Sequence, residues 1–299
     1  MSNENIKLVK QFVNDFSLET TPNVYKKYGS FADLLDKNHL IYITYLPDED
    51  MVNVVETAKK LRLEGFNVVP HLPARTISNK SELKKFIGDL AEKSGCDRIL
   101  IIGGGGKQVG EIASSIDVLK TDYLSKYNYS EVGVAGHPEG NPDIIKEELD
   151  KSIIEKNNFA KNSDFKIYLT TQFFFEASSL IDWEKHLNKL GNKLEIHAGI
   201  PGPATLKTLI SYAKSCGIGN SLRFLSKQAF NITKLASTKS PDKLLFDLAN
   251  YKNSNNKTRL VKLHFYAFGG IKKTSNWLNS LKSNKFIYNA KKEFQILEN

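Results

Sequence analysis

The chain has 299 residues and a net charge of +9, with 40% hydrophobic and 25% charged residues, the composition of an ordinary globular domain. No apolar run is long enough for a membrane helix, and the first residues lack the apolar core of a secretory signal. We therefore expect a cytoplasmic protein with no membrane partner. The two cysteines, Cys96 and Cys216, lack a CxxC partner, which argues against a disulfide framework and a thiolate zinc site.

The positive charge is concentrated near the end of the chain. From residue 221 onward there are 15 Lys and Arg against 4 Asp and Glu, a net +11, so the rest of the chain is near −2. Such a segment is compatible with nucleic acid, but no recognised binding motif accompanies it. We expect instead a basic rim that attracts an anionic small molecule, and no nucleic-acid partner.

Eight short runs rich in Ile, Val, Tyr and Phe recur along the chain, and each ends in polar, Gly or Pro residues. Runs of this length and composition predict buried strands. The expected strands are Phe16–Glu19, Leu40–Tyr45, Asn67–His71, Arg98–Gly103, Val132–His137, Phe165–Gln172, Leu194–Gly199 and Val261–Phe268.

Segments with helical spacing lie between these strands. The clearest are Met51–Leu63, Ser81–Ser94 and Thr205–Cys216. Eight strands that alternate with helices predict an α/β fold, a closed (βα)8 TIM barrel that residues 1–299 form as one catalytic domain. A short N-terminal helix is expected to plug the barrel bottom. Two extra helices, Leu222–Leu235 and Pro241–Tyr251, are expected before the last strand.

In such a barrel, ligand-binding groups gather at the carboxyl ends of the strands. Those ends carry a carboxylate, two imidazoles, an amide, a hydroxyl and two glycine-rich turns. They are Glu19, His71, His137, Gln172, Thr44, 103–106, Gly199 and 266–270. This set is poor in metal ligands, so no metal is expected. It suits a flat polar heterocycle that an amide and a carboxylate recognise.

Each of the individual side chains allows two interpretations. Glu19 is either a general acid, with its pKa raised by an apolar barrel mouth, or a cap of the next helix. Gln172 either binds the edge of a ligand or satisfies the loop backbone. His71 and His137 are either ligand contacts or hydrogen-bonded structural residues. The sequence leaves these alternatives open.

The run Gly103–Gly106, followed by Lys, resembles a phosphate cradle, because glycines let backbone N–H groups approach an anion at the start of a helix. It lacks both the Walker ending and the GxGxxG pattern. A flexible turn is therefore an equal alternative.

Seven stretches together resemble the methylenetetrahydrofolate reductase family, in its catalytic barrel without the long regulatory extension. They are Phe16-Ser17-Leu18-Glu19 followed by Pro22, Tyr42-Ile43-Thr44-Tyr45, Pro70-His71-Leu72, Pro138-Glu139 with Pro142, Thr171-Gln172-Phe173-Phe174-Phe175-Glu176, Gly199-Ile200-Pro201 and His264-Phe265-Tyr266. The Thr-Gln-Phe-Phe-Phe-acidic run is the most specific, and the stretches extend over nearly the whole chain.

The resemblance implies a (βα)8 barrel that reduces 5,10-methylenetetrahydrofolate to 5-methyltetrahydrofolate for methionine biosynthesis. It implies that Glu19 is the acid that helps to open the imidazolidine ring to a 5-iminium cation, and that Gln172 hydrogen-bonds the pterin. Thr171 and Leu206 would also contact the substrate. Cofactor contacts fall at Thr44, His71, Gly103, Gly104, Gly105, His137 and Lys161.

The chain departs from the family on the side of the flavin. Where the family has an Arg-Gly-Asp turn after the fourth strand, this chain has Gly103-Gly104-Gly105. The family's Tyr before Pro-Glu is His137, and its Phe against the substrate is Leu206. Two mechanisms therefore stay open, one with bound FAD and one in which NADH or NADPH passes hydride directly to the folate. The sequence does not choose between NADH and NADPH.

Other functions stay open as well. Loss of the Arg-Gly-Asp turn also suits a folate-binding barrel of another class, such as a one-carbon transferase or a non-catalytic carrier. Only the basic C-terminal third suggests nucleic-acid binding, and we expect it to help capture anionic folate, including a polyglutamate tail. A homo-oligomer is compatible with each of these functions.

Overall fold

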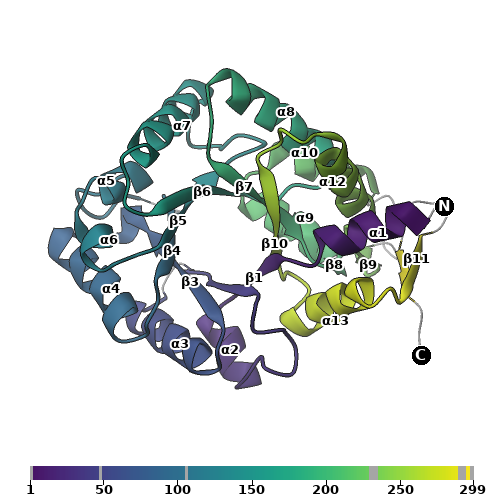
Figure 1. Ribbon diagram of the computed structural model, residues 1–299, viewed down its shortest axis with the longest axis horizontal. Coiled ribbons are helices and arrows are strands. Elements are labelled where there is room, and N and C mark those ends of the chain that lie inside the picture. Colours follow the sequence, from purple (N-terminus) through teal and green to yellow (C-terminus); the bar gives the residue numbers. More distant parts are fainter. Residues whose placement is uncertain (1–2, 47–48, 105–106, 229–234, 289–293, 297–299) are drawn as a thin grey trace.

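Eight parallel strands close into a barrel in the order β1-β2-β3-β4-β5-β6-β7-β10, as Figure 1 shows. The computed structural model describes residues 3–46, 49–104, 107–228, 235–288 and 294–296. The barrel strands are β1 Phe16–Thr20, β2 Leu40–Ile43, β3 Asn67–Pro73, β4 Arg98–Ile102, β5 Glu131–Gly136, β6 Lys166–Thr171, β7 Glu195–Pro201 and β10 Leu260–Tyr266. All eight predicted strands are present, and the predicted (βα)8 TIM barrel is confirmed.

Helices form the outer layer of the barrel (Figure 1). They are α2 Pro22–Tyr28, α3 Met51–Leu63, η1 Ala74–Thr76, α4 Lys80–Glu92, α5 Ser115–Leu119, α6 Tyr123–Lys126, α7 Lys146–Ala160, α8 Ala177–Lys189, α12 Asp242–Ser254 and α13 Ile271–Lys282. Helix α3 has the predicted bounds, and its N-cap Asp50 accepts a hydrogen bond from a first-turn N–H. Helix α4 begins before the predicted Ser81, because Asn79 caps it by accepting a hydrogen bond from the Glu82 N–H.

The prediction that the N-terminal helix plugs the barrel bottom is wrong. Helix α1, Asn3–Phe12, lies on the outside of the barrel, against α12 and α13. Lys252 of α12 places its Nζ 5.5 Å from the centroid of the Phe12 ring. Val9 of this helix and Val13, directly after it, are buried. The apolar side of α1 therefore extends the outer helical layer, and the barrel interior is closed by other residues.

Side chains from alternate strand positions fill the barrel interior. Val69 and Leu100 pack there with Tyr42. The hydroxyls of Tyr42 and Tyr168 meet across the barrel at 2.8 Å, and burial raises the pKa of Tyr42 to about 12. Gly133 leaves room for this pair, because a Cβ at that position would lie 3.0 Å from the Tyr168 ring.

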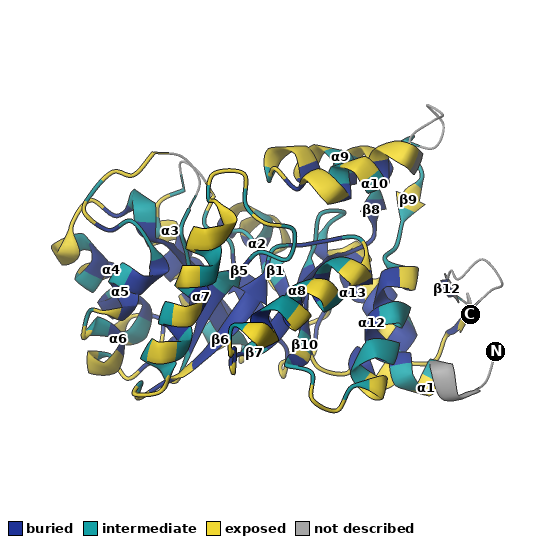
Figure 2. Cartoon of the chain, turned by 90° about the horizontal axis from the view of Figure 1, so that it is seen from above, coloured by how far each residue is buried: buried dark blue, intermediate teal, exposed yellow. Residues whose placement is uncertain are grey.

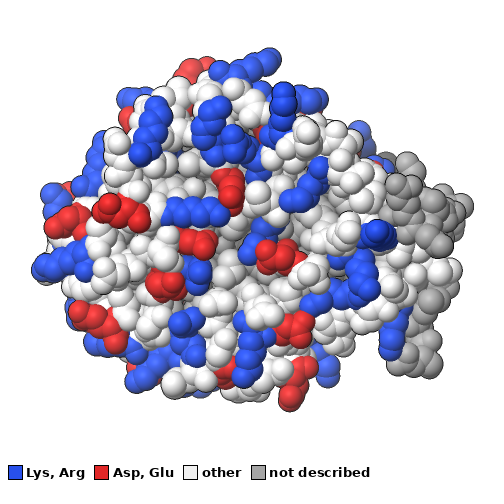
Figure 3. All heavy atoms as spheres, viewed as in Figure 1, with Lys and Arg blue, Asp and Glu red and all other residues white. Residues whose placement is uncertain are grey.

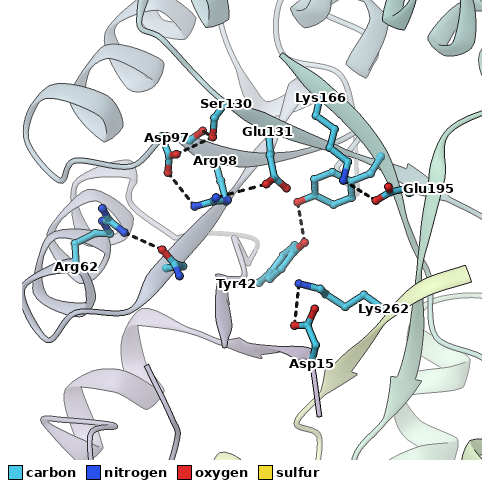
Figure 4. Close-up of polar contacts among 12 residues, drawn as sticks. Asp15, Tyr42, Arg62, Asp97, Arg98, Ser130, Glu131, Lys166, Glu195 and Lys262 are labelled. Carbon is cyan, nitrogen blue, oxygen red and sulfur yellow. Dashed lines mark hydrogen bonds and ion pairs between the residues drawn. The ribbon is translucent and has the colours of Figure 1, made fainter. Parts of the chain in front are cut away.

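Charged side chains close the amino end of the barrel, as Figure 4 shows. We call these residues the amino-end ring. Taken around the barrel from β4 to the start of β1, they alternate in sign: Arg98, Glu131, Lys166, Glu195, Lys262 and Asp15. The ion pairs are Arg98–Glu131 at 3.4 Å, Lys166–Glu195 at 2.6 Å and Lys262–Asp15 at 3.0 Å. Each charge in this ring has a partner of opposite sign, which suits a structural role for this end of the barrel.

The amino-end face carries charges of both signs (Figure 3). Figure 3 shows this face with Lys and Arg interspersed among Asp and Glu. Two of the basic residues pair locally, Lys262 with Asp15 and Lys282 with Asp36. These pairs neutralise two of the basic residues at this end, and the basic rim that the composition predicts stays a prediction.

Two further helices stand above the carboxyl end of the barrel, as Figure 2 shows. This cap consists of α9 Leu206–Ser215 and α10 Gly219–Gln228, with β8 Ala204–Thr205 and β9 Thr238–Lys239 at its base. Helices α10 and α12 correspond to the two predicted extra helices. Helix α10 begins earlier than predicted, and residues 229–234 of the predicted range lie outside the described residues. A hairpin of β11 Phe286–Tyr288 and β12 Phe294–Ile296 follows α13.

The cap has an apolar cluster of its own, separate from the main core. Leu206, Leu209 and Leu225 lie inside it, and it rests on Phe173 and on residues that follow β10. No helix within the described ranges is long and apolar enough to cross a membrane. The same ranges contain no group of three or more His, Cys, Asp or Glu placed to hold a metal ion.

Candidate active site

Glu19 lies at the carboxyl end of β1, and only 12% of its side chain is exposed. Thr44 directly follows β2 and donates from Oγ1 to Glu19 Oε2 at 3.0 Å. His264 of β10 places its Nε2 3.1 Å from Glu19 Oε1. The barrel brings these three residues together because β2 and β10 are the strands that pair with β1.

His264 is completely buried, and both of its ring nitrogens have partners. Its Nδ1 lies 2.9 Å from Ser17 Oγ, and Ser17 faces His264 in the register of β1 with β10. An ionised Glu19 has no proton to donate, so the His264 Nε2–H donates to it. With the proton on Nε2, the Nδ1 is placed to accept from the Ser17 hydroxyl, which also lies 3.4 Å from Leu263 O. These three side chains form one hydrogen-bonded row, the Ser17–His264–Glu19 row.

His71 of β3 lies on the same carboxylate without a hydrogen bond. Its Nε2 is 3.5 Å from Glu19 Oε1, and among the described residues neither ring nitrogen has a hydrogen-bond partner. Burial lowers the pKa of His71 to about 4, so the ring is neutral at pH 7. A buried imidazole without partners costs stability, and a ligand with a polar edge would satisfy it.

The prediction that an apolar mouth raises the pKa of Glu19 is wrong. Burial acts in that direction, but the hydrogen bond from His264, the interaction with His71 and the hydrogen bond from Thr44 outweigh it, and the pKa of Glu19 is lowered. Glu19 is therefore a carboxylate at neutral pH. It does not cap the next helix either, because Thr21 caps α2.

Gln172 directly follows β6. Its backbone N–H donates to Gly136 O at 2.8 Å, and its Oε1 accepts from the Phe173 N–H at 3.0 Å. The side-chain oxygen of Gln172 therefore satisfies the loop backbone, as one of the two interpretations predicts. Its substrate-binding role stays a prediction.

Thr171 connects the end of β6 to its neighbours. Its side chain is completely buried, and its Oγ1 accepts from the Gly199 N–H at 2.8 Å, so this hydroxyl joins β6 to β7. Its carbonyl accepts from the Tyr266 hydroxyl at 2.9 Å, and the Tyr266 ring centroid lies 5.0 Å from that of His264. Tyr266 therefore connects the end of β6 to the Ser17–His264–Glu19 row, while Thr171 itself serves the sheet.

Leu206 is completely buried inside the cap cluster, against which Tyr266 and Phe268 pack. Its substrate contact stays a prediction. The aromatic surface beside the row comes from other residues, because Phe268 stacks on Tyr212 at 4.0 Å and lies 5.5 Å from Tyr266.

The glycine turn after β4 packs onto the segment that follows β3. The Gly103 carbonyl accepts from the Arg75 N–H at 2.9 Å. Gly104 has φ +85, and a Cβ there would lie 3.1 Å from the Pro73 Cβ. Gly105 lies outside the described residues. The phosphate-binding role of this turn stays a prediction.

A buried lysine that the sequence pattern did not single out lies beside β5. Lys156 of α7 is 5% exposed, its Nζ donates to Ala135 O at 3.2 Å, and burial lowers its pKa to about 8. Burial, with this lysine nearby, lowers the pKa of His137 to about 4. Lys161 is exposed at the C-cap of α7 and donates to Asn158, at the amino end of the barrel. This position contradicts its predicted cofactor contact.

The two nitrogens of His71 without a hydrogen-bond partner suit the polar edge of a ring, which both a flavin and a nicotinamide carry. The cofactor contact of His137 stays a prediction.

The fold and this cluster define a (βα)8-barrel protein with one ionised carboxylate held by a histidine and a threonine donor at the carboxyl end of its strands. The family model for methylenetetrahydrofolate reductase matches residues 21–269, and the chain belongs to that family. The match begins directly after the strand that carries Glu19. Family membership supports a folate-related one-carbon oxidoreductase.

Solved structures with a similar course of the chain have low sequence identity. Dihydropteroate synthase from Thermus thermophilus in complex with 6HMPPP aligns with a TM-score of 0.47 and 9% identity, over 92% of this chain and 94% of that chain. The 3-dehydroquinate dehydratase from Aquifex aeolicus aligns with a TM-score of 0.45 and 9% identity, over 90% and 97%. These likenesses carry no argument about the site.

Proposed function

We propose that this protein reduces 5,10-methylenetetrahydrofolate to 5-methyltetrahydrofolate with NADH or NADPH as the hydride donor. The observation that carries the proposal is the Glu19 carboxylate, held by His264 and Thr44 at the carboxyl end of the barrel and faced by the unpartnered ring of His71. Membership of the methylenetetrahydrofolate reductase family supplies the substrate class.

The first step is opening of the imidazolidine ring, which needs a proton at N10 of the folate. Glu19 is ionised before substrate binds, so it takes up a proton from solvent in the substrate complex and delivers it to N10, directly or through a water. The Ser17 hydroxyl, 2.9 Å from His264 Nδ1, orients the ring so that its Nε2 stays on Glu19. After delivery, the Glu19 carboxylate stabilises the positive charge of the 5-iminium cation.

The second step is hydride transfer to the iminium carbon. The protein aligns the donor and acceptor, and the nicotinamide supplies the hydride. Gln172 would turn its amide from the Phe173 N–H to the polar edge of the pterin. His71 would donate to, or accept from, the second ring, and His137 would contact the dinucleotide.

A bound FAD, where present, would supply the hydride carrier between nicotinamide and folate, held by His71 and His137. We favour direct transfer from the nicotinamide, because the turn at Gly103-Gly104 lacks the acid and the base that serve the flavin in the family pattern. Denaturing the purified protein and scanning the supernatant for flavin absorbance tests this choice. Stoichiometric flavin would contradict direct transfer.

The activity itself is tested by following NADH and NADPH oxidation with 5,10-methylenetetrahydrofolate. The matched control is tetrahydrofolate, which lacks the one-carbon bridge and should support no oxidation. We expect oxidation with the first folate and formation of one 5-methyltetrahydrofolate per nicotinamide. No oxidation with either donor, with or without added FAD, would overturn the proposal.

A second candidate is a folate-binding barrel of another class, a one-carbon transferase or a carrier. The glycine turn favours it, because that turn supplies no acidic side chain toward the pterin. Tight folate binding without nicotinamide oxidation would support this candidate over the first.

A further inference from the structure

One carboxylate joins the cap to the barrel. Glu139 lies in the loop between β5 and α7, and both of its oxygens accept hydrogen bonds. Ser221 of α10 donates its N–H to Oε2 at 2.9 Å and its hydroxyl to Oε1 at 2.8 Å. Ser179 of α8 donates its hydroxyl to Oε1 at 3.0 Å. Because both serines lie in the first turns of their helices, the carboxylate also lies at two positive helix ends.

Clefts flank the cap on both sides of this contact. A cavity of about 600 Å³ separates α10 from α8 and includes Arg223, Trp183 and Ser179 in its lining. A cavity of about 260 Å³ lies between the cap and the start of α12, with Leu209 and Lys243 among its lining residues. These two cavities interrupt the packing of the cap against α8 and α12.

The turn between α9 and α10 touches the same loop as Glu139. Gly217 in this turn has φ +64, and a Cβ there would lie 2.6 Å from Pro142 Cγ. The close approach seats the turn directly on the loop between β5 and α7. Together with the Ser221 hydrogen bonds, it gives the cap a polar and a steric contact on one loop, beside His137 and the end of β6.

We propose that Glu139 is the positioning residue that closes the cap over the site, and that substrate enters and leaves when its hydrogen bonds to Ser221 and Ser179 open. The cap core rests on Phe173, the residue after Gln172, so an open cap also frees the segment that carries the predicted pterin contact. Only the identity of the substrate rests on the proposed function.

The first test measures amide hydrogen exchange in Glu139→Gln. The amide keeps the size of the side chain but loses the charge that three donors share. We expect exchange in 206–228 to accelerate about tenfold or more, the change expected from losing a hydrogen bond to a charged group. Exchange in the barrel strands should not change. Cap exchange equal to that of the unmodified protein would overturn the proposal.

Glu64→Gln is the matched control. Glu64 also joins two segments through three donors, the Tyr25 hydroxyl, the Ser30 hydroxyl and the Phe31 N–H, but it lies at the amino end of the barrel. We expect its cap exchange to match that of the unmodified protein. If Glu64→Gln accelerates cap exchange as strongly as Glu139→Gln, the effect is general loosening and the proposal is wrong.

Two further variants open the cap without touching the carboxylate. Ser221→Ala removes one of the two Ser221 donors and should accelerate cap exchange less than Glu139→Gln. Gly217→Ala forces the turn away from Pro142 and should accelerate it without any change of charge. If neither variant changes cap exchange, the contacts with this loop do not hold the cap.

Kinetics separates this proposal from the proposed function. In Glu139→Gln we expect the KM for 5,10-methylenetetrahydrofolate to rise about tenfold, with kcat changed less than about threefold, because the variant changes capture and not chemistry. A fall in kcat with KM unchanged would place Glu139 in the chemistry and contradict a positioning role. If the protein has no reductase activity but Glu139→Gln still accelerates cap exchange, the proposed function is wrong and the role of Glu139 in closing the cap stands.

Discussion

The two ends of the barrel treat polar side chains in opposite ways. At the amino end, the amino-end ring alternates in sign and each charge has a neighbour of opposite charge (Figure 4). At the carboxyl end, hydrogen-bond donors converge on the one carboxylate of Glu19, and His71 stays buried without a hydrogen-bond partner in the described structure.

This difference separates a structural arrangement from a functional one. The charges of the amino-end ring are paired within the chain, although Arg98 Nε has no hydrogen-bond partner among the described residues, and we expect this ring to contribute to stability alone. The Glu19 cluster leaves buried polar groups that a ligand would satisfy, which costs stability and prepares the site. Variants at the two ends should therefore change different measured quantities.

The largest expected effect is on turnover in Glu19→Gln. The amide cannot carry a proton to N10 or stabilise the iminium cation, so kcat should fall about a hundred- to ten-thousandfold. The matched control is Glu131→Gln in the amino-end ring, which should keep kcat within a factor of about two. Equal kcat in Glu19→Gln and Glu131→Gln would show that the carboxyl end is no more important for catalysis than the amino end.

The next effect concerns His264→Gln. Its hydrogen bond is the largest contribution that lowers the pKa of Glu19, so its loss should raise that pKa and move the acid limb of the kcat profile to higher pH. We expect kcat to fall about tenfold to a hundredfold at neutral pH. Ser17→Ala should give a smaller loss, because it leaves the contact between His264 and Glu19 in place. An unchanged pH profile in His264→Gln would remove the row from the mechanism.

A smaller effect is the dependence of stability on pH. The pKa of His71 is lowered to about 4 in the folded protein, so the unfolded chain binds a proton first as the pH falls below its ordinary value. The folded state therefore loses stability between pH 7 and pH 5, by about 2 kcal/mol for this one residue. Urea unfolding at pH 7 and pH 5 gives the loss in the free energy of unfolding for each protein. This loss should be smaller in His71→Gln than in the unmodified protein by about the same amount. An equal drop in both proteins would mean that His71 is not held neutral.

The smallest effect is expected at the amino end. Arg98→Met leaves Glu131 without its partner and should lower the free energy of unfolding by about 1 kcal/mol, with kcat unchanged. Lys185→Met at the exposed pair with Asp182 is the control and should change it by less than about 0.5 kcal/mol. A large loss of turnover in Arg98→Met would show that the amino end also takes part in function.

The barrel and its strand ends could be predicted because both follow from local pattern. Runs of β-branched and aromatic residues mark the strands, and polar residues after them mark the carboxyl end. The position of Glu19 follows from that pattern. Its pKa does not, because the donors are Thr44, directly after β2, and His264 of β10, and these two strands pair with β1.

His264 could have been found from its spacing. It lies between Lys262 and Tyr266 at period two, so all three face the barrel interior. What the sequence does not contain is the closure of β10 on β1, which places Ser17 opposite His264. Barrel closure is a long-range pairing with no local signal.

The prediction for Lys161 fails because of the direction of its helix, and the prediction for Leu206 stays untested. The resemblance assigned a cofactor contact to Lys161, but α7 runs from the carboxyl to the amino end, so its last residues lie far from the site. Lys156, more than one turn earlier, reaches Ala135 instead. Leu206 is apolar, and the cap buries it in its own cluster. Neither helix direction nor cap packing can be read from a motif.

The most direct test of the account is the fate of deuterium from NADH or NADPH labelled at the transferred position. We predict that mass spectrometry finds the label in the methyl group of 5-methyltetrahydrofolate, and that Glu19→Gln forms this product at least about a hundredfold more slowly. Folate that binds but never acquires the label, or labelled product that forms equally fast in Glu19→Gln, would contradict the role of the Glu19 cluster.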